Sequence, residues 1–233
     1  TGSILTSEIY NGETIDARKE KISWTTASYK DGDWSAVKLV NADNAALIAT
    51  YNEPIRKHET FKALKLIKTP KGEQVIDFGQ NLVGWVQVKI KGNAGDKITL
   101  YHAEVLDKSG NFYTENLRPA KQQNVYILKG GVEEVFEPHF TFQGFRFVKV
   151  EDFKGEIKLE NFNAIALYSD MKQTGSFTSS NALINQLQHN IEWGQKGNFL
   201  DVPTDCPQRD ERLGWTGDAQ AFSRTATFNM GVH

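Results

Sequence analysis

The sequence contains a single cysteine, Cys206, and no run of about 18 apolar residues. One cysteine excludes an internal disulfide and is too few for a thiolate metal cluster, and without a long apolar run no membrane-spanning helix is expected. The 27 Lys and Arg nearly balance the 29 Asp and Glu, so the chain lacks the basic surplus of nucleic-acid-binding proteins. The five histidines show no zinc-type spacing, and no motif indicates a cofactor. We therefore expect no metal, cofactor, nucleic-acid partner or membrane span.

The sequence begins Thr1-Gly2-Ser3 and shows no charged-then-apolar leader, so we expect any targeting segment to be absent or removed. The cysteine count is compatible with oxidising and reducing compartments, so periplasmic, extracellular and cytoplasmic locations all stay open. The sequence has no internal repeat and no low-complexity segment. Hydrophobic residues make up 39% of its 233 residues, which is enough for a substantial core.

The first 170 or so residues show the period of two that is typical of half-buried strands. Val86, Val88 and Ile90 alternate with polar or aromatic residues, and Ile98 and Leu100 do the same after a Gly/Asn turn. Further short runs of this kind lie at 125–128, 140–147 and 165–168. Short strands joined by turns, with no helical stretch between them, indicate an antiparallel sandwich or barrel.

Five aromatic residues at strand spacing are expected to fill the core of this β region, with a carbohydrate-binding face as the alternative. They are Trp85, Phe140, Phe142, Phe145 and Phe147. His102 and His139 lie in or beside strands, and we interpret both as structural histidines.

The pattern becomes helical near residue 175. Asn181 is a good N-cap, and Leu183, Leu187 and Ile191 recur at helical spacing behind it. A second helix is predicted to begin around 216–218. Two short amphipathic helices cannot cover each other and also enclose a pocket, so we expect the chain to be a fragment of a longer protein.

Chemically active side chains concentrate in the segment DVPTDCPQRDERLGWTGD, residues 201–218. Its charged and aromatic residues are Asp201, Asp205, Asp210, Glu211, Asp218, Arg209, Arg212 and Trp215. Two prolines disfavour a helix there, so we predict a shaped loop. Because crowded carboxylates cannot all keep ordinary pKa values, one of them is expected to carry a proton at neutral pH.

A protonated carboxyl group beside carboxylates, arginines and an exposed indole is typical of a carbohydrate site with general acid catalysis. The alternative is a surface loop whose ion pairs contribute little to stability. Cys206 is interpreted as a small buried packing residue, and Asp201 as a brace of the loop.

The segment DVPTDCPQRDERLGWTGDAQ (201–220) resembles the signature of the bacterial α-L-rhamnosidases of glycoside hydrolase family 78. Upstream stretches are similar to the β domains of that family: SEIYNGETIDAR (7–18), NEPIRKHE (52–59), VIDFGQNLVGWVQVKIKG (75–92), HAEVLDKSGNFYTENLRPAK (102–121) and FTFQGFRFVKVE (140–151). The resemblance covers almost the whole chain and implies a mainly β fold, an antiparallel β-sandwich followed by the first helices of a truncated (α/α)6 barrel.

The resemblance also implies a hydrolase that releases terminal α-L-rhamnose from glycosides or polysaccharides with inversion. Glu211 matches the general acid of the family, and Asp205, Arg209, Trp215 and Asp218 match residues that contact the sugar. Asp210 is the competing acid, with an ion pair to Arg209 or Arg212 as its structural alternative. The general base of the family is a glutamate later in the barrel, and nothing in this chain corresponds to it.

Three regions are expected from the resemblance. Residues 1–55 would be the tail of an N-terminal β domain, 56–172 the sandwich, and 173–233 the incomplete start of the catalytic domain. Without the base, we expect this chain alone to be inactive and its exposed barrel-facing helices to favour association. The alternatives are a carbohydrate-binding sandwich and a structural brace, neither of them catalytic.

Overall fold

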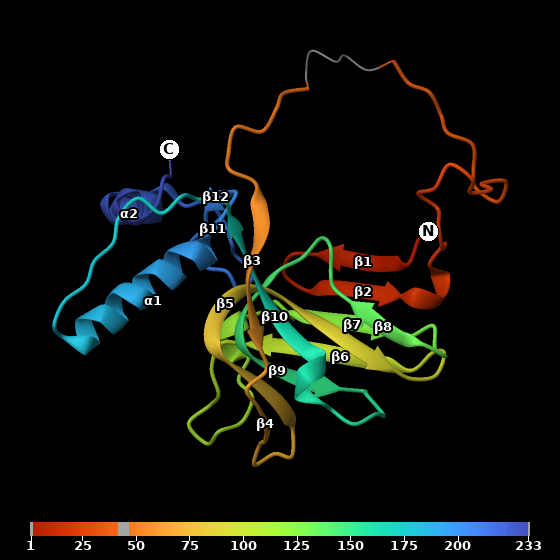
Figure 1. The fold of residues 1–233 in the computed structure, drawn as a ribbon, viewed down its shortest axis with the longest axis horizontal. Helices are drawn as coiled ribbons and strands as arrows, with labels where there is room; N and C mark the ends of the chain where they lie inside the picture. Colours follow the sequence, from red (N-terminus) through yellow and green to blue (C-terminus); the bar gives the residue numbers. More distant parts are fainter. Residues whose placement is uncertain (1, 42–46, 233) are drawn as a thin grey trace.

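The computed structural model describes residues 2–41 and 47–232, which form one curled ten-stranded sheet with two helices at one side (Figure 1). The strands of this sheet are β1 (Ile4–Glu8), β2 (Gly12–Asp16), β3 (Ile55–Lys62), β4 (Lys65–Lys68), β5 (Gln74–Lys91), β6 (Lys97–Ala103), β7 (Gln123–Ile127), β8 (Glu133–Phe136), β9 (Gln143–Glu151) and β10 (Phe162–Ser169). Apart from a short turn at Ala17–Lys19, the described residues between β2 and β3 contain no helix or strand.

The main path of the sheet runs β1-β2-β7-β6-β9-β5-β10-β3, with β4 and β8 paired to β5. The pairings are antiparallel as predicted, except that β2 and β7 run parallel. The long strand β5 pairs with four others and shifts register between Asp77 and Leu82. A strand that changes register in this way bends, and the bend lets one sheet fold over its own core.

The core lies inside the curled sheet and follows the predicted alternation. In β5, Val86, Val88 and Ile90 are buried whereas Lys89 is exposed. Tyr126 of β7 and Phe136 of β8 stack inside with ring centroids 4.7 Å apart. Burying such side chains contributes about 1.5–3 kcal/mol each, which makes this cluster the main stabilising feature of the sheet.

The phenylalanines of the 140–147 segment differ in their burial. Phe145 and Phe147 are buried in the core as predicted, and Phe142 is partly buried against a smaller cluster with Trp85. Phe140 is 68% exposed, so its assignment to the core was wrong. Strand β9 begins only at Gln143, and Phe140 therefore lies in a loop where strand alternation does not apply.

Both predicted helices are present. Helix α1 (Ala182–Asn198) begins after Asn181, whose side chain accepts a hydrogen bond from the Leu183 amide at 2.9 Å. The C-terminal end of α1 packs on β5 so closely that a Cβ on Gly197 would lie 2.8 Å from a Val83 methyl carbon. A short hairpin, β11 (Phe199–Leu200) and β12 (Val202–Pro203), connects α1 to the chemically rich loop, and α2 (Thr216–Asn229) follows.

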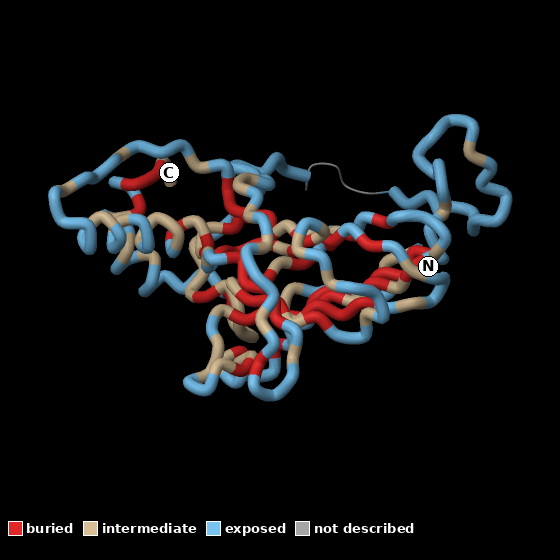
Figure 2. Tube along the Cα trace, turned by 60° about the horizontal axis from the view of Figure 1, so that its bottom comes forward, coloured by how far each residue is buried: buried red, intermediate tan, exposed pale blue. Residues whose placement is uncertain are grey.

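The outer face of α1 is uncovered in this structure. Leu183 is 80% exposed and Leu187 is 57% exposed, and Figure 2 shows the outer turns of the helix as mostly exposed. The association expected from this apolar stripe stays a prediction. Neither helix of residues 2–41 and 47–232 has the length and apolar character that crossing a membrane requires.

The buried His102 of β6 makes the stability of the fold depend on pH. Its Nδ1 lies 2.7 Å from the Gln122 carbonyl oxygen, while its Nε2 is buried without a partner. Burial lowers the pKa of His102 from 6.5 to about 4. The unfolded chain therefore binds the proton more readily between these pH values, and folding loses about 3 kcal/mol as the pH falls from about 6.5 to 4.

We predict that His102→Gln destabilises the chain at pH 7.5 but that this difference narrows towards pH 4.5, because glutamine removes the titrating group. Urea unfolding followed by circular dichroism across this range measures both free energies of unfolding. Phe145→Leu is the control, since it perturbs the ring packed on His102 without adding or removing a titrating group. A difference between wild type and His102→Gln that stays constant with pH contradicts the prediction.

Candidate active site

The loop between β12 and α2 is shaped by side-chain hydrogen bonds rather than by regular secondary structure. At its start, the Asp201 amide donates to Ser169 Oγ at 2.9 Å, and Asn52 Nδ2 donates to the Asp201 carbonyl at 3.0 Å. Asp201 has a φ of 70°, a left-handed conformation that such bonds stabilise. Asp201 is exposed and joins the loop to the sheet, as its interpretation as a brace requires.

The Glu211 carboxylate accepts hydrogen bonds on both oxygens. Arg118 Nη2 donates to Oε2 at 2.9 Å and Arg209 Nε donates to the same oxygen at 3.1 Å. Trp215 Nε1 donates to Oε1 at 3.0 Å. Donors from the β6–β7 connection, the loop and the residue before α2 thus fix the orientation of this half-buried side chain, which is 24% exposed.

Asp205 lies beside Glu211 because Arg209 joins the two, with Nη2 of the arginine 3.3 Å from Asp205 Oδ2. The Leu213 amide donates to the other carboxylate oxygen at 3.0 Å. Burial acts to raise the pKa of Asp205, but hydrogen bonds from Leu213, Cys206 and Arg209 outweigh it and hold the pKa below its usual value. Asp205 is therefore not the carboxyl with a raised pKa that the crowded loop predicted.

The structure thus brings together four of the five predicted site residues. The fifth, Asp218, is exposed in the first turn of α2 and has no hydrogen bond or ion pair to the other four within the described residues. Trp215 immediately precedes this helix and is 49% exposed, so one side of its indole is open to a ligand.

Arg212 is the buried anchor of the loop. Its guanidinium donates to the carbonyl oxygens of Ile9, Phe142 at 2.6 Å, Arg209 at 3.1 Å and Gln208 at 3.2 Å, and to Gln122 Oε1 at 3.3 Å. No carboxylate oxygen of residues 2–41 or 47–232 lies within 4.0 Å of it, and burial lowers the pKa of Arg212 to about 10. The charge is compensated by carbonyl dipoles and by the faces of Tyr10 and Phe142, 5.7 and 5.1 Å away.

Comparison with known protein families shows which family the chain resembles along its length. Three bacterial α-L-rhamnosidase domain families match consecutive parts of the chain: the N-terminal domain over residues 1–59, the concanavalin-like domain over 67–168 and the 6 hairpin glycosidase domain over 172–233. The chain belongs to the bacterial α-L-rhamnosidase family.

Individual rhamnosidases resemble the chain over its full length. An α-L-rhamnosidase of Streptomyces avermitilis is 42% identical over 233 residues, which cover 99% of this chain and 22% of that protein. One from Formosa agariphila is 42% identical over 241 residues, covering 100% of this chain and 25% of that protein. The chain thus spans about a quarter of the length of these curated relatives.

Solved rhamnosidase structures share the fold. The crystal structure of the Streptomyces avermitilis enzyme complexed with L-rhamnose matches with a TM-score of 0.92 at 43% identity, over 98% of this chain and 22% of that one. The native Aspergillus terreus α-L-rhamnosidase matches with a TM-score of 0.94 at 41% identity, over 99% of this chain and 27% of that one. Both likenesses cover almost the whole of this chain.

Two residues of this candidate site come from the β region and were not predicted. Arg118 contacts both Asp210 and Glu211, and the Tyr10 hydroxyl donates to the Glu211 carbonyl at 2.8 Å. The expected partners of Asp210, Arg209 and Arg212, were therefore wrong, because its ion pair is with Arg118. Both residues lie in stretches quoted for the family resemblance, but no local pattern links positions about 90 and 200 residues apart.

Asp205, Cys206 and Glu211 offer oxygen and sulfur atoms within 4.8 Å of one another, as a metal site would. Arg209 already neutralises both carboxylates. Cys206 is buried, and burial raises the pKa of its thiol, so the thiolate that a metal requires is disfavoured. We assign no metal to these three rhamnosidase residues.

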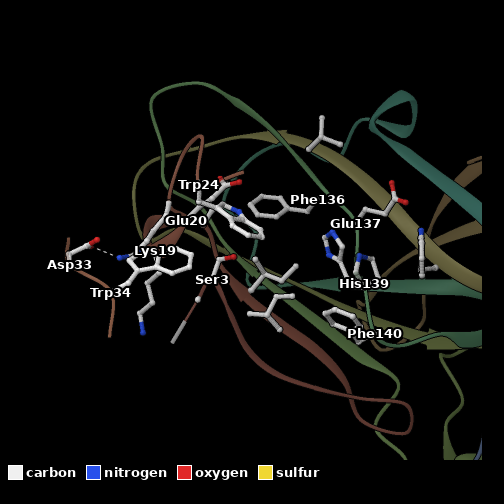
Figure 3. A pocket seen from close by; sticks show the side chains of 18 of the residues that line it. Ser3, Lys19, Glu20, Trp24, Asp33, Trp34, Phe136, Glu137, His139 and Phe140 are labelled. Atoms are coloured by element: carbon white, nitrogen blue, oxygen red, sulfur yellow. Dashed lines mark hydrogen bonds and ion pairs between the residues drawn. The ribbon is translucent and has the colours of Figure 1, made fainter. Parts of the chain in front are cut away.

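A hollow of the chain lies far from the loop in sequence, at the edge of the sheet near the N-terminus. Figure 3 shows Trp24, Trp34, Phe136, His139 and Phe140 around it, and its volume is about 1200 Å³. Trp24 is 57% exposed and the two indoles have ring centroids 6.1 Å apart. Exposed aromatic faces with polar neighbours can bind sugar rings, so this hollow is a second candidate for carbohydrate contact.

We predict that Arg212→Met lowers the free energy of unfolding by about 3 kcal/mol or more, because it leaves several buried carbonyl oxygens without donors at about 1–3 kcal/mol each. Hydrogen exchange should also accelerate at the Leu213 amide, which is bonded to Asp205. Urea unfolding and exchange mass spectrometry provide the two measurements.

Arg56→Met is the matched control for Arg212→Met. The exposed Arg56 forms a 3.0 Å ion pair with Asp170 on the sheet, and losing it should cost no more than about 1 kcal/mol. Equal losses of stability in the two variants would show that Arg212 does not anchor the loop.

Proposed function

We propose that this chain supplies the general acid side of an α-L-rhamnosidase active site, with Glu211 as the acid. Asp205, Arg209, Trp215 and Asp218 are proposed to bind the rhamnose of a glycoside or polysaccharide. The observation that carries the proposal is the convergence of Arg209, Trp215 and Arg118 on the Glu211 carboxylate, with Asp205 on the same arginine.

In this proposal Glu211 transfers its proton to the glycosidic oxygen as the bond from that oxygen to the anomeric carbon breaks. Oε2 accepts from two guanidinium groups, whereas among the described residues Oε1 accepts only from Trp215. Oε1 therefore retains a lone pair on which a proton can be carried. The exposed indole of Trp215 lies next to that oxygen and offers its face to the C–H groups of the sugar.

The proposal assigns inversion to the reaction, with the base outside this chain. One oxygen of Asp205 and one of Glu211 lie within 4.8 Å of each other, closer than the roughly 6.5–9.5 Å between the carboxyl groups of an inverting pair. Nor is Asp205 suited to be a nucleophile, because its side chain is 6% exposed and both of its oxygens accept hydrogen bonds. The water would be activated by a glutamate later in the catalytic domain, as the family resemblance implies.

We predict that Glu211→Gln in a full-length rhamnosidase containing this chain slows hydrolysis of an alkyl α-L-rhamnoside by about 10²–10⁴-fold, because an alkoxide leaves only when protonated. Steady-state kinetics on the folded variant measures the effect. Asp210→Asn is the matched control, since it neutralises the adjacent carboxylate that pairs with the same arginine. A larger loss in Asp210→Asn than in Glu211→Gln would move the acid to Asp210.

A second candidate function is carbohydrate binding without catalysis, favoured by the exposed aromatic residues of the hollow near the N-terminus. The same experiment separates the two functions. If the wild-type protein hydrolyses no rhamnoside at all, the hollow becomes the leading site, and the loop is left with a structural role.

We also predict that the purified 233-residue chain alone gives no measurable rhamnoside turnover. An inverting reaction requires a second carboxylate as the base, and in this proposal that base lies outside the chain. A sensitive fluorogenic α-L-rhamnoside, assayed alongside a preparation of Glu211→Gln to reveal contaminating host enzyme, provides the measurement. Turnover by the wild-type chain that Glu211→Gln abolishes would contradict this prediction.

A further inference from the structure

Arg118 is the only arginine outside the 201–218 loop that contacts the Glu211 carboxylate among the described residues. It follows the 3₁₀ turn η3 (Glu115–Leu117) in the connection between β6 and β7, 93 positions before Glu211. Its Nη2 donates to Glu211 Oε2 at 2.9 Å, and its Nε pairs with Asp210 Oδ1. One planar guanidinium thus contacts two consecutive carboxylates through different nitrogens.

The backbone of Arg118 is flanked by buried residues. Leu117 before it is 1% exposed and Ala120 after it is 5% exposed, so the segment is held in the core on both sides. Arg118 itself has a φ of 57°, a left-handed conformation that a non-glycine residue keeps only when its surroundings determine it. The guanidinium therefore extends from a segment of the β region whose neighbouring residues are buried.

Arg209 contacts the same oxygen of Glu211, but it cannot hold that oxygen in place relative to the β region. Arg209 and Glu211 are two residues apart on one loop, so a movement of the loop carries both. Arg118 belongs to the connection between β6 and β7, and with the Tyr10 hydroxyl on the Glu211 carbonyl it ties this residue to the β region. Lysine at position 118 would place one ammonium where the guanidinium makes a hydrogen bond to Glu211 and an ion pair with Asp210.

We propose that Arg118 is a positioning residue for the glycosidase reaction, holding the Glu211 carboxylate so that its Oε1 side faces the leaving group. This inference rests on the proposed role of Glu211 as general acid. It assigns to the β region a direct part in orienting the acid. Misplacement of a catalytic group by about 1 Å can cost about 10²-fold in rate, so the contact has a measurable consequence.

The test compares two leaving groups in a full-length rhamnosidase containing this chain. Arg118→Gln should lower kcat on an alkyl α-L-rhamnoside by about 10–100-fold, and on 4-nitrophenyl α-L-rhamnoside by less than about 3-fold, because nitrophenolate leaves without protonation. Arg118→Lys should recover part of the alkyl rate. Arg56→Gln, which removes an exposed arginine of the sheet from its pair with Asp170, should change neither rate.

Several outcomes overturn the inference. Equal losses on both substrates would indicate a merely structural role, since a smaller folded fraction lowers both rates alike. A raised KM with unchanged kcat on both substrates would make Arg118 a substrate-binding residue instead. Glu211→Gln is run in parallel: if it lowers the alkyl rate while Arg118→Gln does not, the inference fails alone, and if neither lowers it, the proposed acid fails as well.

Discussion

The buried guanidinium of Arg212 is the interaction on which the candidate site depends. It satisfies carbonyl oxygens from the β1–β2 turn, from the segment before β9 and from its own loop, and it contacts the buried amide of Gln122. Gln122 in turn bonds to the main chain of His102 and Gly144. A loop without regular secondary structure is thereby connected to the hydrogen-bond network of the sheet. Such a network makes the connected segments rigid, because any movement that broke one of its hydrogen bonds would leave a buried polar group without a partner.

The close contact between loop and sheet explains how an irregular segment can hold catalytic geometry. A Cβ on Gly144 would lie 3.0 Å from Pro207 and 3.1 Å from Gln208, so a larger residue there would require β9 or the loop to shift by a few tenths of an ångström. The main chain is fixed by this packing and by Arg212, and the side chain of Glu211 is then oriented by Arg118, Arg209 and Trp215. Precise sites require such a supporting shell on rigid elements. The β region thus contributes a residue that contacts Glu211, in addition to packing against the loop.

Much of the fold could be predicted because it depends on local signals. The alternation in β5 and the Asn181 cap each follow from spacing within a few residues, and the structure has both. The prediction that Phe140 is buried was wrong because Phe140 precedes the start of strand β9, and strand alternation does not apply in a loop. The parallel pairing of β2 with β7 was not foreseen, since strands separated by over 100 residues leave no trace of their relative direction in either sequence.

The residues of the candidate site likewise divide into those that the sequence predicted and those that it did not. Asp205, Arg209, Glu211 and Trp215 are close in sequence, and a shaped loop brings them together, as predicted. The contacts of Arg118, of Tyr10 and of Asp210 depend on long-range packing, which local patterns do not encode.

The most direct measurement is a crystal structure of a full-length rhamnosidase containing this chain with an S-linked α-L-rhamnoside that resists hydrolysis. We predict that Glu211 lies within about 3.5 Å of the bridging sulfur while Arg118 keeps its contact with Oε2. A rhamnoside bound only in the hollow beside Trp34, with Glu211 far from the bridging atom, would contradict the account.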